Sequence, residues 1–122
     1  MSDAEVAGQV GEISEIERSL GLYKIKFTTE EYTIYQVQNR SMRNAWVTLK
    51  FFDVHNIKFT PYGEAKVVPS PESAYHTYAS ILVKANTTLS VVKLTQQNPE
   101  ITEWTYNYDY LVEKDDSPAW LQ

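Results

Sequence analysis

The sequence predicts an all-β fold, either an antiparallel β-sandwich or a small β-barrel, with one short N-terminal helix. From Leu22 onward, apolar side chains recur at every second position, which is typical of half-buried strands. Turn residues interrupt this alternation at spacings of about ten residues, as they do in sandwiches and barrels. The alternation does not distinguish a sandwich from a barrel, so both remain open.

The first segment, residues 1–21, is expected to form an N-terminal arm that contains the helix. Its apolar residues follow the spacing of one helix face: Val6, Val10, Ile13, Ile16 and Leu20. Gly8 and Gly11 disfavour a helix near the beginning of this segment, since glycine costs about 1 kcal/mol in a helix interior. We therefore predict the helix over residues 12–20.

The second segment, residues 22–113, is predicted to be the antiparallel β domain. The strands that the alternation predicts are residues 22–28, 31–38, 45–54, 57–59, 66–68, 75–84, 89–95 and 104–112. In the strand over 45–54, Lys50 lies on one face, so the face with Val47, Leu49 and Phe51 is predicted to point to the core. Pro69 and Pro71 end the strand before them and predict an extended loop.

Composition and charge exclude several classes of protein. The 122 residues contain no cysteine, so disulfides and thiolate metal sites are excluded. No run approaches the roughly 18 apolar residues of a membrane span, and we expect no contact with membranes. The acidic N-terminus lacks the features of a secretory signal, so a cytoplasmic or virion location is expected.

No catalytic, cofactor or metal site is predicted. The four glycines form no phosphate-binding loop, and no nucleophile elbow is present. Asp53 and His55 would share a face of an extended segment and could act as base and orienting group, but we interpret them as an exposed polar pair at a strand end. His76 has no companions of metal-ligand type, and we interpret it as a half-buried histidine.

Residues 32–59 combine basic and aromatic side chains within a chain whose net charge is -5. Single-stranded nucleic acid is bound by cations that follow the phosphates and by rings that stack on bases. The candidate nucleic-acid-binding residues are Tyr32, Tyr35, Arg40, Arg43, Trp46 and Lys50. The alternative interpretation is that the rings belong to the core and the cations to a solvated loop.

Aromatic residues also alternate along the last strand and recur at the end of the chain. Because tyrosine hydroxyls need partners, we expect the aromatic face of the last strand to reach a sheet edge. The acidic end, residues 114–122, resembles the acidic tail with a hydrophobic tip of bacterial single-stranded-DNA-binding proteins, whose tip docks into partner proteins. It differs from that tail in its acidic run of two residues, in the lysine that interrupts the run and in the missing linker before it. The candidate interface residues are Trp104, Tyr106, Tyr108, Tyr110, Trp120 and Leu121.

Three functions follow from these features. The first is a non-enzymatic assembly subunit, such as a bacteriophage capsid decoration or tail protein, that works through contacts with other protein subunits as a homo-oligomer or larger assembly. The second is a single-stranded-nucleic-acid-binding protein with a barrel of the oligonucleotide-binding type. The third is an inhibitor or adaptor whose acidic ends mimic nucleic acid.

Overall fold

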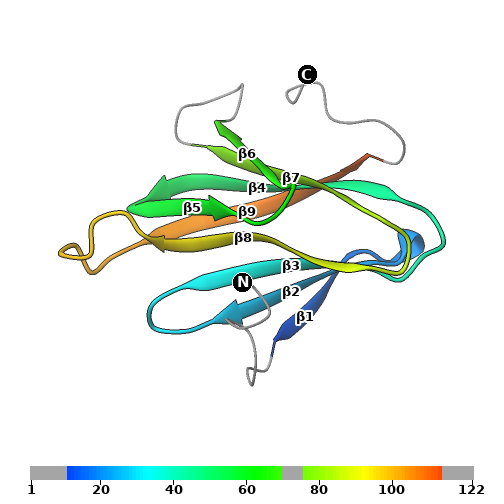
Figure 1. Cartoon of the computed structure of the whole chain (residues 1–122). Helices are drawn as coiled ribbons and strands as arrows, with labels where there is room; N and C mark the ends of the chain where they lie inside the picture. Colours follow the sequence, from blue (N-terminus) through cyan, green and yellow to red (C-terminus); the bar gives the residue numbers. More distant parts are fainter. Residues whose placement is uncertain (1–10, 70–75, 114–122) are drawn as a thin grey trace.

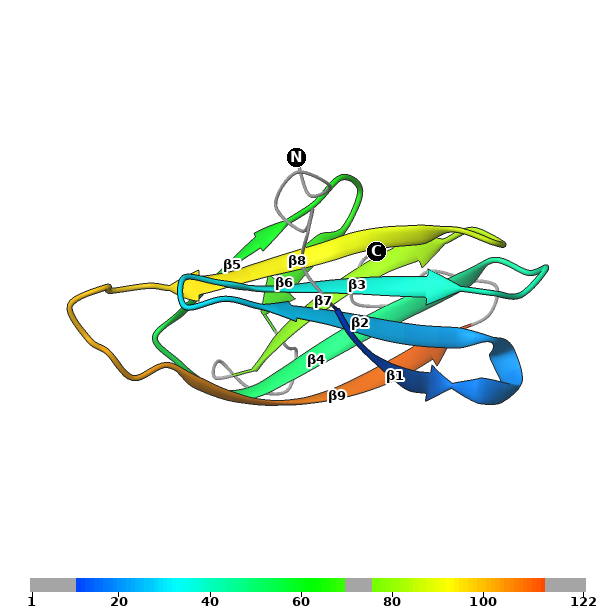
Figure 2. The same ribbon diagram turned by 90° about the horizontal axis from the view of Figure 1, so that it is seen from below.

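The fold consists of two antiparallel β-sheets that face each other and do not close into a barrel (Figures 1 and 2). The computed structural model of the chain describes residues 11–69 and 76–113, with only the backbone for residues 108 and 110–113. The sequence left a sandwich and a barrel open, and the structure is a sandwich.

Each sheet brings together strands that are distant in the sequence. The first sheet has the order β1-β2-β3-β8-β5, with β1 at Glu12–Glu17, β2 at Leu22–Thr28, β3 at Thr33–Asn39, β8 at Thr88–Gln96 and β5 at Ile57–Pro61. The second sheet has the order β6-β7-β4-β9, with β6 at Lys66–Pro69, β7 at Thr77–Val83, β4 at Ala45–His55 and β9 at Thr105–Glu113. The strands from β2 onward fall where the alternation predicts them. Pro69, which the sequence predicts to lie after its strand, is instead the last residue of β6 and is paired with Thr77, as an edge strand allows.

The main core lies between the two sheets. Val47, Leu49 and Phe51 of β4 are at most 1% exposed, which confirms the predicted core face of this strand. Residues of the first sheet, including Val37 and Leu94, pack against them in one cluster. A smaller cluster of Ile25, Phe27 and Ile34, with Tyr32 and Tyr62 packed against it, covers the opposite face of the first sheet.

The helix predicted over residues 12–20 is wrong. Residues 12–17 form β1, which pairs with β2, and only Arg18–Leu20 form a 3-10 helix, η1. Ile13, which a helical face would bury, is 54% exposed. Hydrogen bonding to β2 and burial of Ile16 in the main core outweigh the local helical spacing. Residues 1–10 of the predicted arm and the loop at Pro71 lie outside the described residues.

Gly11 gives a direct test of the packing on the outer face of the first sheet. A Cβ at this position would lie 2.4 Å from Ile25 Cγ2 and 2.8 Å from Phe27 Cζ. We expect Gly11→Ala to lower the free energy of unfolding by about 1–3 kcal/mol, because both neighbours are buried and must shift. Denaturant unfolding measures this change. Gly63→Ala is the comparison, since no atom lies within 4 Å of that Cβ and only its positive φ of 53° opposes the substitution, at about 1 kcal/mol. A loss below that of Gly63→Ala would contradict this packing.

Candidate interaction surface at the open edge of the sandwich

Three of the four edge strands carry features that block pairing with another chain. Short length, lysine, proline and charge are the usual protective devices of sheet edges. β5 and β6 have five and four residues, and each contains a lysine and a proline. β1 is protected by three glutamates: Glu12, Glu15 and Glu17.

β9 is the remaining edge, and it lacks most of these devices. It is nine residues long, contains neither proline nor lysine, and pairs with β4 from Trp46↔Glu113 to His55↔Thr105. Its other side has no strand partner among the described residues, and it lies at the margin of the second sheet (Figure 2). No described residue pairs with the backbone N–H and C=O groups on this side, which makes the edge a candidate for addition of a further strand.

A groove of about 490 Å³ lies beside the beginning of β9. Lys26, Trp104, Thr105, Tyr106 and Asn107 line it. Lys26 comes from β2 of the first sheet, so the groove joins the two layers on their open side. It offers an incoming chain two half-buried rings and one ammonium group next to the free strand edge.

Tyr106 is fixed from below by the aromatic part of the core. Its hydroxyl lies 2.5 Å from the hydroxyl of Tyr35, which is fully buried. The ring of Tyr106 packs edge-on against Tyr35 and Phe51, with centroids 6.4 Å and 5.6 Å away. The buried Lys24 places its ammonium 5.7 Å from the centroid of Tyr35. These contacts anchor one wall of the groove in the main core.

The expectation that the aromatic strand lies at a sheet edge is confirmed. Trp104 and Tyr106 are half-buried, and both pack against the main core. The side chains of Tyr108 and Tyr110 lie outside the described residues, as do Trp120 and Leu121. The role of these residues in an interface stays a prediction.

Two of the aromatic residues proposed for nucleic-acid binding lie in different clusters. Tyr35 is fully buried between the sheets and offers no surface to a base. Tyr32 packs against the outer cluster of the first sheet, with the Lys93 ammonium 4.9 Å from its ring centroid. The alternative interpretation, that these rings belong to the core, therefore describes Tyr35 correctly.

The other four candidates occupy two further places. Arg40 and Arg43 are exposed in the loop between β3 and β4. Trp46 and Lys50 alternate with the core residues of β4 and so point away from the first sheet, with Lys50 5.1 Å from the ring centroid of Tyr78. The six candidates are thus distributed over separate regions and do not line one groove.

The polar pair at the end of β4 is separated by an irregularity in the strand. The register shifts between Phe52 and His55, and Asp53 has a φ of 49°, so the two side chains do not follow the regular alternation of a strand. The Asp53 carboxylate lies 3.5 Å from the side-chain amide of Asn107. His76 packs edge-on against Phe52. Within the described ranges, no group of three or more His, Asp or Glu side chains is placed to hold a metal ion.

The sequence analysis missed Lys24 and Lys26 as residues of this region. Both share a face of β2 with Leu22, which lies in the main core, whereas Ile25 and Phe27 lie in the outer cluster. The signal was present, because two lysines in phase with a core leucine indicate a sheet face that is only partly covered.

Comparison with known proteins gives one likeness at the level of fold. No family model and no curated protein matches the chain. A solved structure of a Leishmania major hypothetical protein superimposes with a TM-score of 0.55 at 14% sequence identity, over 90% of this chain and 89% of that one. This likeness shows the fold alone. In the part of the chain that the structure describes, no helix has the length and apolar character needed to cross a membrane.

Proposed function

We propose that the chain is a non-enzymatic assembly subunit that binds other protein subunits through the open edge of β9. Small structural components of particles such as bacteriophage virions belong to this class. The observation that carries the proposal is the contrast among the edge strands, of which β9 alone is long and free of proline and lysine.

Strand addition is the binding mode that fits this edge. A strand from a second subunit would pair with the free backbone groups of β9, and its side chains would alternate between solvent and the groove. Trp104 and Tyr106 supply large rigid rings of the kind that dominate binding energy at interfaces. The same edge on two copies would form an isologous pair and a closed dimer.

Charges placed on the edge test the proposal. The double substitution Thr105→Lys and Asn107→Lys puts two cations on exposed positions of β9. We expect the subunit to dissociate, with self-association weakened at least about tenfold, because like charges would face each other across the added strand. Light scattering coupled to size exclusion, over a range of concentrations, measures the mass.

Thr88→Lys is the control, since it adds one cation at an exposed position of β8, a strand inside the first sheet, and is compared with Thr105→Lys alone as well as with the double variant. The control is expected to keep the mass of the wild-type chain. A wild-type chain that is monomeric at high concentration would contradict the proposal. Co-elution of the wild-type chain with a poly-dT oligonucleotide, lost at high salt, would favour nucleic-acid binding instead.

A further inference from the structure

A second surface lies at one end of the sandwich, where three connections meet. They are the β1–β2 connection with η1, the loop between β3 and β4, and the loop between β7 and β8 (Figure 1). A cavity of about 320 Å³ opens there, lined by Ser19, Leu20, Ser41, Met42, Arg43, Asn44 and Ala45. Met42 is 83% exposed, which is unusual for a large apolar side chain.

We propose that this cavity binds the chain's own acidic C-terminal tail, residues 114–122, with Trp120 and Leu121 in the cavity and the Asp115-Asp116 pair against Arg43. The inference is independent of the function proposed for β9.

The loops that form the cavity are held by hydrogen bonds within the fold. Arg40 N–H donates to the Gly21 carbonyl at 2.8 Å, and Asn86 N–H donates to the Ser41 carbonyl at 3.1 Å. Ala85 N–H donates to the Asn44 side-chain oxygen at 3.0 Å. A preorganised site of this kind binds a peptide without the entropy cost of ordering its own loops.

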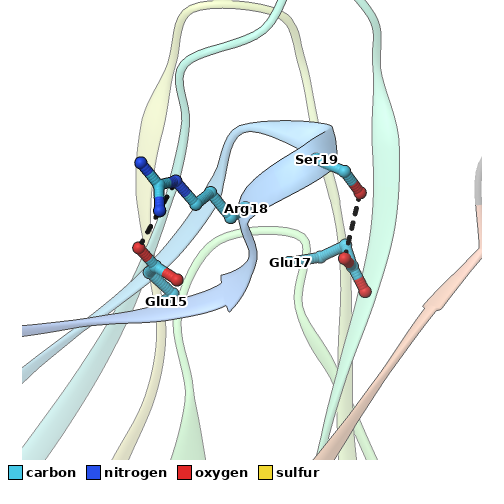
Figure 3. A network of polar contacts seen from close by, with 4 residues as sticks. All are labelled: Glu15, Glu17, Arg18 and Ser19. Atoms are coloured by element: carbon cyan, nitrogen blue, oxygen red, sulfur yellow. Dashed lines mark hydrogen bonds and ion pairs between the residues drawn. The ribbon is translucent and has the colours of Figure 1, made fainter.

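The charge and apolar character of the cavity match those of the tail. The Arg43 guanidinium has no hydrogen bond or ion pair with any residue that the structure describes, so it is available to a carboxylate. On the η1 side of the cavity, Arg18 lies 3.9 Å from Glu15 and the Ser19 hydroxyl donates to Glu17 at 3.0 Å, so this side has two carboxylates for one cation (Figure 3). An acidic segment would therefore favour the Arg43 side.

The last described residue, from which the tail begins, lies close to the cavity. Glu113 pairs with Trp46, and the neighbour of Trp46, Ala45, lines the cavity. If this register continued, residues 115 and 116 would lie opposite residues 44 and 43. Nine residues reach about 30 Å when extended, which is enough to reach the cavity from Glu113. A tether this short gives an effective concentration of about 1 mM or more, which favours the chain's own tail over that of a second copy.

A spin label at the end of the chain tests the proposal, because the chain has no native cysteine. Gln122→Cys carries a nitroxide, and the loss of intensity of ¹⁵N amide signals reports which residues it approaches. We expect strong loss at Leu20, Met42 and Asn44, and none in the loop of residues 98–101 at the opposite end of the sandwich (Figure 1). The substitutions Thr105→Lys and Asn107→Lys are included as a background, so that pairing through β9 does not affect the result.

Variants of the tail and cavity define the contacts. Trp120→Ala with Leu121→Ala is expected to reduce the signal loss at Leu20, Met42 and Asn44 to the weaker, uniform level that an undocked tail on the same tether produces. Arg43→Glu is expected to weaken docking about twofold to fivefold, and Asp115→Arg with Asp116→Arg to restore it. Lys58→Glu is the matched control, since it reverses an exposed charge on β5, and is expected to leave the pattern unchanged.

Two results would overturn the proposal. The first is an absence of signal loss at the cavity in the intact chain. The second is observed in a mixture of two chains, one with the spin label and natural-abundance ¹⁴N, the other with ¹⁵N and no spin label. Signal loss at the cavity in this mixture would place the tail of a neighbouring copy there.

Discussion

Replacement of Phe51 by alanine is expected to lower the free energy of unfolding by about 3–5 kcal/mol. Phe51 is fully buried in the main core, and its ring contacts aromatic residues of both sheets. The centroids of Phe59, Tyr35 and Tyr106 lie 5.0 Å, 5.6 Å and 5.6 Å from its own. Because the three rings come from different strands, a cavity at Phe51 removes contacts that hold the layers together.

Phe52→Ala is the matched control for this prediction. Phe52 is the next residue of β4, but it is half-buried and packs edge-on against His76 at 4.7 Å. Its removal is expected to lower the free energy of unfolding by about 1 kcal/mol. Equal losses for Phe51→Ala and Phe52→Ala in urea unfolding would contradict the assignment of the core face. Since the ring of Phe51 packs against Tyr106, only Phe51→Ala is expected to alter the binding of another subunit at the groove beside β9.

The strands could be predicted from the sequence because strand formation leaves a local signal. In β4, the alternation of Val47, Leu49 and Phe51 with polar and half-exposed residues identifies both the strand and its buried face. In β9, the alternating aromatic residues and the needs of their hydroxyls also predicted the edge position, which the sheet order confirms. Both inferences depend only on residues next to each other in the chain.

The sheet order could not be predicted in the same way. β8 lies between β3 and β5, and β4 lies between β7 and β9, so each central strand pairs with distant segments. The predicted helix failed for the same reason. Local spacing favoured a helix over residues 12–20, but pairing with β2 makes this segment the edge of the first sheet. Such long-range contacts override local preference.

The candidate site was only partly visible in the sequence for a related reason. Trp104 and Tyr106 were identified from their own strand, whereas Lys26 joins them from β2 of the other sheet. The length of β9 and its lack of proline and lysine become informative only when the other three edges are known. The site is therefore a property of how the strands are arranged, in addition to which residues they contain.

The second large effect is expected for Asn39, a buried residue at the end of β3. Its side-chain amide donates to the carbonyls of Arg43 at 2.7 Å and Val83 at 3.0 Å. Its side-chain oxygen accepts from the backbone N–H of Ser41 at 2.9 Å and from the Ser41 hydroxyl at 2.7 Å. One side chain thus connects the β3–β4 loop to the end of β7. We expect Asn39→Ala to lower the free energy of unfolding by about 2–4 kcal/mol, because it leaves buried groups without partners.

Asn56 provides the comparison at the opposite end of the sandwich. Its amide donates to the carbonyls of Asn98, Ile101 and Glu103 at 2.9–3.1 Å, but it is only half-buried. Water can replace these bonds, so Asn56→Ala is expected to lower the free energy of unfolding by about 1–2 kcal/mol, part of which comes from placing alanine at a φ of 58°. Denaturant unfolding of both variants measures the difference, and equal losses would contradict the argument from burial. Amide exchange should also accelerate in residues 41–44 of the Asn39 variant alone, because those residues form the cavity wall that Asn39 holds in place.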